Sequence, residues 1–295
     1  MGKKINGKGL LDIILSWSFH DVRNDHPDNA IVPGIPIHFD SVPQYLSSFK
    51  PAFLQETRAQ LSSAIDNFSS DISLTIVSFR QNQNFNNPTN LLYDAVFHSP
   101  TTTHVQYGDV IAFSTTKPTQ PEDIARCYIV AVVVSSAGED SSERTLLSSK
   151  LVEFRQGDDL FAVRLGNVTT NMRIWEALSS GKDAPFLNKV IEDDNLSHDC
   201  IFTERLVPSS LLSDIATWHL NQSQEEAVMD GIKKSICFDN YSVNLIWGPP
   251  GTGKTTTLAC MMSSMLKLQR RTLACAPTNV AVQEMSTRLL RRVTG

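Results

Sequence analysis

The stretch LIWGPPGTGKTTTL, residues 245–258, decides the fold expected for the C-terminal part of this 295-residue chain. Residues 248–255 match the phosphate-loop pattern G-x-x-x-x-G-K-[ST] at every fixed position. In such a loop, glycines turn backbone N–H groups toward phosphate oxygens, the lysine neutralises the terminal phosphates, and the hydroxyl binds Mg²⁺. We therefore expect an ATP and Mg²⁺ site with Lys254 and Thr255 as catalytic residues and Thr255 as the Mg²⁺ ligand. The predicted nucleotide-binding loop consists of Gly248, Pro249, Pro250, Gly251, Thr252, Gly253, Lys254, Thr255 and Thr256.

The residues on either side of the loop predict the strand and the helix that such a loop connects. SVNLIW, residues 242–247, has the pattern of a buried strand, and RTLACA, residues 271–276, predicts a second one. Residues 280–292 have helical spacing. After Lys254, apolar residues also recur at helical intervals, which predicts an amphipathic helix with one face in the core. That predicted core stripe is Leu258, Met261, Met262, Met265 and Leu266.

Pro277, Thr278 and Asn279 lie between the second predicted strand and its helix. In an open parallel sheet, the carboxyl ends of the strands form the edge where ligands bind. A hydroxyl and an amide at that edge have two possible roles: they can contact nucleic-acid phosphates, or they can cap the helix. The residues alone leave both roles open.

The part of the chain before the loop predicts helices around a small β-domain. Residues 10–75 read as mainly helical, and residues 169–180 and 209–218 return to helical spacing. The segments between them are short and rich in β-branched residues, so we expect an antiparallel barrel or sandwich. The predicted strands are SLTIVSF (73–79), GDVIAF (108–113), YIVAVVV (128–134), LVEF (151–154) and LFAVRL (160–165), with a loop at 135–144. Ser223 and Glu226 have the spacing of a capping box at the start of the next helix.

Composition limits the possible functions. The longest apolar run, Tyr128–Val134, has seven residues, far fewer than the roughly 20 that cross a bilayer, so we expect no membrane span. The five cysteines are widely spread, which argues against a zinc site or a disulfide framework and favours an intracellular protein. Net charge is −5, but the segment from Lys254 onward has seven basic residues and one acid, Glu284. This segment suits a phosphate-rich ligand, whereas the predicted barrel has few basic residues and fits a spacer better than a nucleic-acid-binding platform.

Three segments together carry a resemblance to a known family. LNQSQEEAV (220–228), LIWGPPGTGKTTTL (245–258) and LACAPTNVAVQEM (273–285) resemble the start of the motor of superfamily-1 helicases of the senataxin and nonsense-mediated-decay group. Upstream, residues 10–22, 45–65 and 169–178 resemble the plant senataxin-like branch. The resemblance thus spans nearly the whole chain, and the three motor motifs are its specific part.

The resemblance implies a fold and a set of roles. It implies an α/β P-loop, RecA-like motor domain preceded by helical stalk segments and an inserted antiparallel β-barrel. Gln224 matches the glutamine that reads the adenine edge, consistent with the paired donor and acceptor of an amide. Pro277, Thr278 and Asn279 match the motif that contacts the backbone of single-stranded RNA or DNA. A nuclear location follows only from the resemblance to senataxin.

The chain also departs from the family pattern. ATP hydrolysis needs a carboxylate that holds Mg²⁺, and after Thr255 the only acid is Glu284, which lies inside a predicted helix. The family's Asp-Glu motif, later motifs and second motor domain have no counterpart here, so we expect an N-terminal portion of a helicase, inactive alone. The alternatives are a non-hydrolysing nucleotide- or nucleic-acid-binding remnant and an unrelated P-loop ATPase. The expected regions are a helical stalk (1–75), the barrel (76–168), a helical return (169–218) and an incomplete motor domain (219–295).

Overall fold

The computed structural model divides the chain into two units, Met1–Asp183 and Ala184–Gly295, and each unit is described by itself. The boundary between them falls within the segment 169–218 that the sequence suggests is one helical return. The described residues are 9–23, 32–68, 73–85, 87–98, 105–126, 129–136, 143–152, 159–180, 187–188, 191, 207–236 and 243–293.

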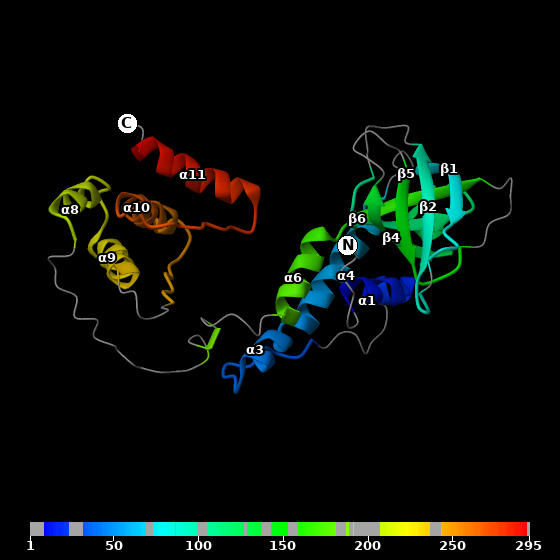
Figure 1. The fold of residues 1–295 in the computed structure, drawn as a ribbon, viewed down its shortest axis with the longest axis horizontal. Helices are drawn as coiled ribbons and strands as arrows, with labels where there is room; N and C mark the ends of the chain where they lie inside the picture. The colour runs from blue at the N-terminus through cyan, green and yellow to red at the C-terminus, as the bar shows by residue number, and fades with distance from the viewer. Residues whose placement is uncertain are drawn as a thin grey trace. The chain divides into compact units, whose positions relative to one another are not determined.

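The first unit contains a closed antiparallel barrel with the strand order β1-β2-β5-β4-β3-β6 (Figure 1). Its strands are β1 (Leu74–Gln81), β2 (Leu91–His98), β3 (Asp109–Ser114), β4 (Ile129–Ser136), β5 (Glu143–Ser148) and β6 (Leu160–Asn167). The prediction of a barrel is confirmed, but β2 and β5 were missed. The predicted strand at LVEF is wrong for Leu151 and Val152, which follow the end of β5, while residues 153–154 lie outside the described residues. The loop expected at 135–144 overlaps the end of β4 and the start of β5. Its middle, residues 137–142, lies outside the described residues.

Strands β3, β4 and β6 are apolar on both faces because both faces are covered. Ile111 and Phe113 point into the barrel and join its interior core, whereas Val110 and Ala112 point outward and pack with helical residues such as Ile14. All six residues of β3 are buried as a result. A strand buried on both sides reads as a continuous apolar run rather than an alternating one. This double burial explains the run of apolar residues in β4.

Helices pack against this outer face and extend away from the barrel as a pair. Before the barrel come α1 (Leu10–Ser16), α2 (Phe19–Arg23), α3 (Val42–Ser48) and α4 (Lys50–Asp66); α5 (Pro121–Arg126), not predicted, precedes β4, and α6 (Thr169–Ser180) follows β6. Helices α4 and α6 lie side by side (Figure 1). The buried Asn171 of α6 donates from Nδ2 to Thr57 Oγ1 (3.0 Å) and Gln60 Oε1 (3.1 Å) of α4. A satisfied polar contact in an otherwise apolar interface fixes the register of the two helices.

Tyr93 is the largest fully buried side chain in the barrel interior, and its hydroxyl oxygen accepts a hydrogen bond from Val152 N–H (3.1 Å). Burial raises the pKa of the Tyr93 phenol above its ordinary value, and the hydrogen bond from Val152 opposes that rise. The folded state therefore favours the neutral phenol. The stability that this preference contributes is complete below pH ~10, the ordinary phenol pKa, and is lost as pH rises through the folded-state pKa.

We expect Tyr93→Phe to lower the free energy of unfolding by about 1–2 kcal/mol at pH 7, because the buried N–H of Val152 loses its acceptor. Urea unfolding measures the change. The difference in unfolding free energy between the wild type and Tyr93→Phe should narrow above pH ~10, because the side chain at position 93 ionises only in the wild type. Tyr107→Phe, at a half-exposed position of the same unit, is the control. Equal stability of wild type and Tyr93→Phe at pH 7 contradicts the assigned role of the hydroxyl.

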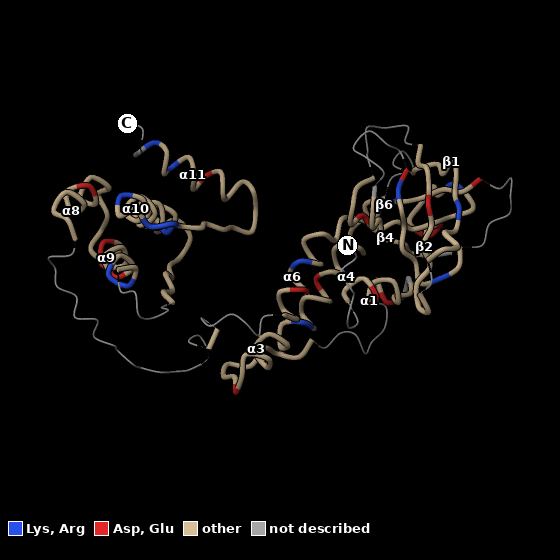
Figure 2. Tube along the Cα trace, viewed as in Figure 1, with Lys and Arg blue, Asp and Glu red and all other residues tan. Residues whose placement is uncertain are grey.

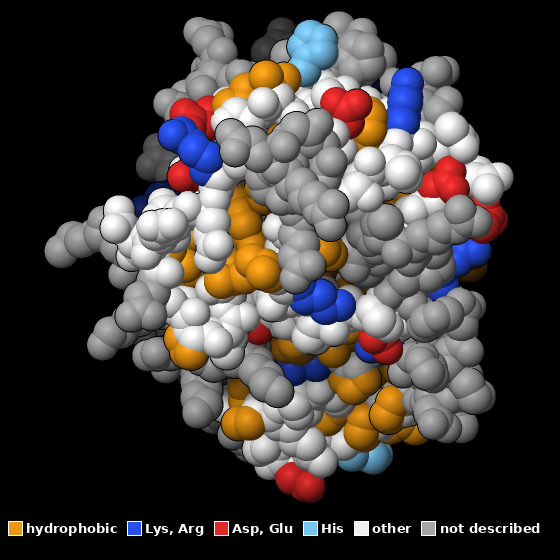
Figure 3. All heavy atoms as spheres, turned by 90° about the vertical axis from the view of Figure 1, so that its right-hand side faces the viewer, with side chains coloured by type: hydrophobic (Ala, Val, Ile, Leu, Met, Phe, Trp, Pro, Cys, Tyr) orange, Lys and Arg blue, Asp and Glu red, His pale blue; other side chains and the backbone are white. Residues whose placement is uncertain are grey.

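The face of the first unit at the barrel end bears no continuous basic patch among its described residues. Figure 3 shows Lys and Arg side chains scattered there among acidic and apolar ones. Two of the barrel's arginines are engaged internally: Arg144 is buried and donates from Nε to Val105 O (2.7 Å), and Arg164 forms an ion pair with Asp109.

The second unit contains four described helices of at least eight residues: α8 (Ser209–Ala216), α9 (Gln222–Ile236), α10 (Lys254–Lys267) and α11 (Asn279–Val293). Its core forms where α8, α9 and α10 meet, with Leu211, Ile215, Val228, Ile232, Cys260 and Met265 buried together. Gly231 allows a close approach there, because a Cβ at this position would lie 2.6 Å from Met261 Cε. None of the described helices is both long enough and apolar enough to cross a membrane.

Two predicted strands in this unit are wrong. Residues 243–247 and 271–276 form no strand in the described part of the chain. A strand needs a neighbouring backbone to pair its N–H and C=O groups, and these extended segments have none there. The core stripe predicted for α10 is wrong in part: Met265 is buried, but Leu258 and Leu266 are exposed by 40% and 49%. The face that α8 and α9 cover instead includes Cys260 and Ser264.

Candidate functional site

The phosphate loop turns through two glycines and ends at the first residue of a helix. Gly251 and Gly253 have φ of +80° and +83°, a backbone conformation that glycine adopts without strain. Gly253 is the N-cap of α10, and its carbonyl accepts from Thr257 N–H (3.0 Å). The first N–H groups of an α-helix have no partner within the helix, and the helix dipole is positive at this end. The N-terminus of the 14-residue α10 and the loop before it therefore suit an anion.

Lys254 is held inside the loop by carbonyl oxygens. Its Nζ donates to Gly248 O (2.6 Å) and Pro249 O (2.7 Å), and Thr252 Oγ1 donates to Pro249 O (2.9 Å). A Cβ on Gly248 would lie 2.7 Å from Thr252 Oγ1, so a larger residue there would displace the Thr252 side chain. A phosphate oxygen is charged and forms a stronger hydrogen bond to an ammonium than a neutral carbonyl does. The arrangement fits a triphosphate that would take over the contacts of Lys254, with Thr255 one residue further on.

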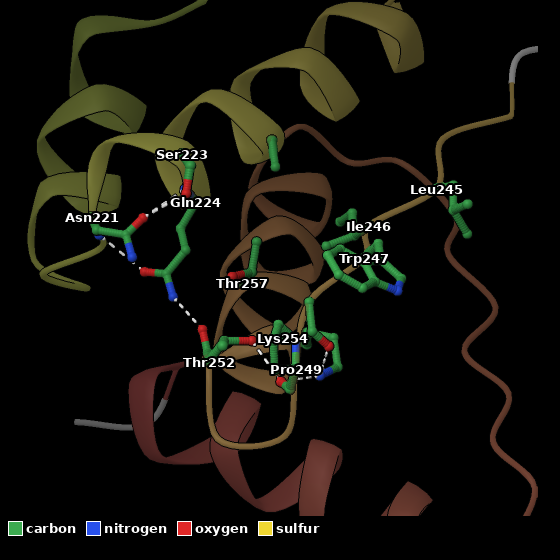
Figure 4. Close-up of a pocket in the computed structure, with 12 residues that line it drawn as sticks. Asn221, Ser223, Gln224, Leu245, Ile246, Trp247, Pro249, Thr252, Lys254 and Thr257 are labelled. Atoms are coloured by element: carbon green, nitrogen blue, oxygen red, sulfur yellow. Dashed lines mark hydrogen bonds between the residues drawn. The ribbon is translucent and has the colours of Figure 1, made fainter.

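Gln224 connects the start of α9 to the phosphate loop. Its Nε2 donates to Thr252 O (2.9 Å), and its Oε1 accepts from Asn221 N–H (2.9 Å) (Figure 4). Asn221 Oδ1 in turn accepts from Gln224 N–H (3.0 Å), so the capping box is Asn221 with Gln224. The predicted capping box of Ser223 and Glu226 is therefore wrong, because the helix begins two residues earlier than that spacing requires. Ser223 Oγ donates to Asn221 Oδ1 instead (2.9 Å).

A cavity of about 450 Å³ lies between the start of α9 and the phosphate loop. This volume is within the range of small-molecule and cofactor sites, roughly 300–1,000 Å³. Figure 4 shows Gln224 on one side of the cavity and Ile246 with Trp247 on the other. Trp247 is 85% exposed. The lining brings together the predicted residues Gln224, Gly248, Pro249, Thr252 and Lys254, and it adds Asn221, Ser223, Ala227, Leu245, Ile246, Trp247 and Thr257.

Thr278 caps α11. Its Oγ1 accepts from Ala281 N–H (3.2 Å), and its carbonyl accepts from Val282 N–H (3.2 Å). The capping role that the sequence left open is therefore present in this structure. Asn279, the first residue of α11, and Pro277 are exposed, so both are accessible to a ligand. Lys and Arg residues occur along α10 and α11 (Figure 2). The exposed start of α11 suits a phosphate oxygen, because the first N–H groups of a helix have no partner within it.

The Glu284 carboxylate is paired within its own helix. Its Oε1 accepts from Arg288 Nε (2.8 Å), one turn later in α11. The described residues contain no group of three or more His, Cys, Asp or Glu side chains able to hold a metal ion. Thr255 stays the predicted Mg²⁺ ligand, and the Glu284 carboxylate is paired with Arg288 in this structure.

Sequence reasoning missed two features of this site. Asn221 was overlooked because Ser223 and Glu226 also have capping-box spacing. The hydrogen bond from Arg288 Nη1 to Thr256 Oγ1 (2.9 Å) joins residues 32 positions apart, and no local pattern signals it.

Comparisons with known proteins match both units. Residues 6–198 match the family described as a domain of unknown function, DUF6469, and residues 219–295 match the family described as an AAA domain. The chain is 27% identical over 167 residues to Helicase sen1 of Schizosaccharomyces pombe, covering 50% of this chain and 9% of that protein. It is 44% identical over 71 residues to the Regulator of nonsense transcripts 1 homolog of Arabidopsis thaliana, covering 24% of this chain and 5% of that protein. ATP-dependent helicase NAM7 of Saccharomyces cerevisiae is 41% identical over 71 residues, covering 24% and 7%.

The phosphate loop and these matches define the class: the chain is part of a superfamily-1 helicase of the senataxin and nonsense-mediated-decay group. Within that class it belongs to the DUF6469 family, whose match covers more than half of the chain. The resemblance seen in the sequence is confirmed at the level of the group, and the plant branch stays a prediction. The chain spans less than a tenth of the length of these curated relatives.

Proposed function

We propose that this chain binds ATP with Mg²⁺ through its phosphate loop and contacts single-stranded RNA or DNA through Pro277, Thr278 and Asn279, as part of an ATP-dependent helicase. The observation that carries the proposal is the loop itself, in which positive-φ glycines end at the start of α10 around the Lys254 ammonium. The names of relatives support it. NAM7 is an ATP-dependent helicase, and SMUBP-2 of Rattus norvegicus, 41% identical over 70 residues (24% of this chain, 6% of that protein), is a DNA-binding protein.

Gln224 gives the proposed site a preference for adenine. A side-chain amide offers two N–H donors and two acceptor lone pairs, and the contacts to Thr252 and Asn221 use one of each. One donor and one acceptor are left on the same amide, which borders the cavity. Adenine presents an acceptor, N7, beside a donor, the N6 amino group, whereas guanine presents two acceptors at the same edge. The remaining pair therefore matches adenine and not guanine.

We expect Gln224→Ala to reduce the preference for ATP over GTP about tenfold, since a bidentate pair is worth about 1–3 kcal/mol of discrimination. Titration calorimetry of the 295-residue chain with each Mg²⁺–nucleotide measures the preference. Asn221→Ala is the matched control, because it removes the side-chain cap on Gln224 N–H but keeps the Gln224 amide and its contact with the backbone N–H of residue 221. Absence of ATP binding by the wild-type chain would refute the proposed function, and an unchanged preference in Gln224→Ala would refute only the role of Gln224.

The titration together with an assay of ATP turnover separates the helicase proposal from its alternatives. Because Glu284 is paired with Arg288, we expect ATP to bind to this chain without turnover stimulated by nucleic acid. A longer chain that includes the family's acidic motif should hydrolyse ATP. Turnover by the 295-residue chain that depends on Lys254 would exclude the non-hydrolysing interpretation.

Two finer assignments follow from resemblance alone. We place the protein in the plant senataxin-like branch on the similarity of residues 10–22, 45–65 and 169–178, and in the nucleus on the similarity to senataxin. The location is tested by imaging a fluorescent fusion of the full-length protein; exclusion from the nucleus refutes it.

A further inference from the structure

Arg288 of α11 contacts two helices at once. Its Nε donates to Glu284 Oε1 (2.8 Å) in its own helix, and its Nη1 donates to Thr256 Oγ1 (2.9 Å) in the first turn of α10. The guanidinium is planar and presents its donors in a fixed fork. The bond to Glu284 therefore fixes the direction in which Nη1 points, which is toward Thr256.

The two ends of this connection lie next to the two proposed binding regions. Thr256 directly follows Thr255, the Mg²⁺ ligand that the loop offers, while α11 begins at Asn279 with Thr278 as its cap. Arg288 lies nine residues after Asn279, about 14 Å along a helix that rises ~1.5 Å per residue. A helix of this length moves as a rigid body, so a displacement at Arg288 also displaces the residues at its start.

We propose that Arg288 is a positioning residue that transmits the occupancy of the phosphate loop to the start of α11. The proposal rests on the proposed ATP site. The hydrogen bond from Arg288 to Thr256 is already formed without nucleotide, and a triphosphate that takes over the contacts of Lys254 would hold the first turn of α10, and the Thr256 hydroxyl with it, in this position. Helix α11 is then held in one position, with Thr278 and Asn279 arranged for a phosphate backbone. Because coupling between two sites is reciprocal, bound nucleic acid must strengthen ATP binding by the same factor.

The contact of Arg288 with Glu284 and Thr256 is exposed, so a role in coupling can be measured separately from a role in stability. The side chains of Arg288 and Glu284 are 42% and 56% exposed. Exposed ion pairs of this kind contribute little to the free energy of unfolding. Variants that remove the contact should therefore fold like the wild type, and a change in coupling between the two regions cannot be ascribed to unfolding.

The test is hydrogen exchange of the 295-residue chain with and without Mg²⁺ and a non-hydrolysable ATP analogue. In the wild type the analogue should slow exchange both in the phosphate loop and in α11, the latter about fivefold, the lower end of typical coupling factors. In Arg288→Ala, protection of the phosphate loop should remain and protection of α11 should be lost. Arg291→Ala removes an exposed positive charge from the same helix and should behave like the wild type. Arg288→Lys should restore part of the protection.

Protection of the phosphate loop without protection of α11 in the wild type overturns the proposal and leaves ATP binding standing. Protection of α11 that persists in Arg288→Ala overturns it as well. Absence of protection at the phosphate loop refutes ATP binding and, with it, the role of Arg288.

Discussion

Lys254→Ala is expected to weaken ATP binding by about 10- to 100-fold, because charge-assisted hydrogen bonds contribute about 1.5–3 kcal/mol. The ammonium that now donates to Gly248 O and Pro249 O is the loop's only cation and would face the terminal phosphates. Its removal should change little in the free protein, since the exposed Pro249 carbonyl can bond to water instead. The loss is therefore a loss of binding and not of folding.

Thermal unfolding with and without ATP separates these two effects. At a concentration 100 times the Kd, ATP stabilises the folded state by about 2.7 kcal/mol, and a 100-fold weaker Kd at the same concentration leaves about 0.4 kcal/mol. Lys267→Ala is the matched control: Lys267 ends the same helix and pairs with Asp214, outside the cavity. An ATP-induced shift in Lys254→Ala as large as that of the wild type contradicts the assignment of the loop.

Asp109→Ala is expected to lower the free energy of unfolding of the first unit by about 2–4 kcal/mol. The Asp109 carboxylate is fully buried where β3 begins, and it accepts from Gln106 N–H (2.8 Å) and Asn167 Nδ2 (2.8 Å). Arg164 Nε lies 2.8 Å from Oδ2 as an ion pair, without hydrogen-bond geometry. Removing the carboxylate leaves Gln106 N–H without its acceptor and leaves Asn167 Nδ2 with only its hydrogen bond to Tyr107 O (2.8 Å), whereas the partly exposed Arg164 can turn to water.

Because of the position of Asp109, its loss should affect the first unit as a whole and not only the start of β3. Asn167 ends β6 and accepts from Thr169 N–H (3.0 Å) at the start of α6, so the carboxylate lies where the barrel meets the helical pair. Gly108, with φ +82°, allows the approach, because a Cβ there would lie 2.1 Å from Thr169 Oγ1. Urea unfolding measures the effect, and Asp159→Ala, at an exposed position just before β6, is the control. A loss below about 0.5 kcal/mol, the size of an ordinary surface substitution, would refute the role of Asp109.

The barrel illustrates which strands can be read from a sequence. Strands β3, β4 and β6 are covered on both faces, and their short segments rich in apolar and β-branched residues predicted them. Strand β2 reads LLYDAVFH and β5 reads ERTLLS, in which charged residues interrupt the pattern. These two pair with each other in the closed sheet, Asp94 opposite Thr145, and Asp94 accepts from the Thr145 hydroxyl (3.1 Å). Such residues are compatible with a strand only because of a partner 51 positions away.

The sequence by itself determined the local chemistry: a phosphate loop at 248–255, a helix after it, and a small antiparallel β-domain between helical segments. Each follows from neighbours a few residues apart, through backbone conformation or apolar spacing. Only the tertiary structure decided which residues meet across the chain. It joined Gln224 to Thr252, Arg288 to Thr256 and Asn171 to Thr57, and it left residues 243–247 and 271–276 without strand partners in the described chain. Hydrogen bonds between distant residues depend on how whole elements pack, and no local pattern of residues encodes that packing.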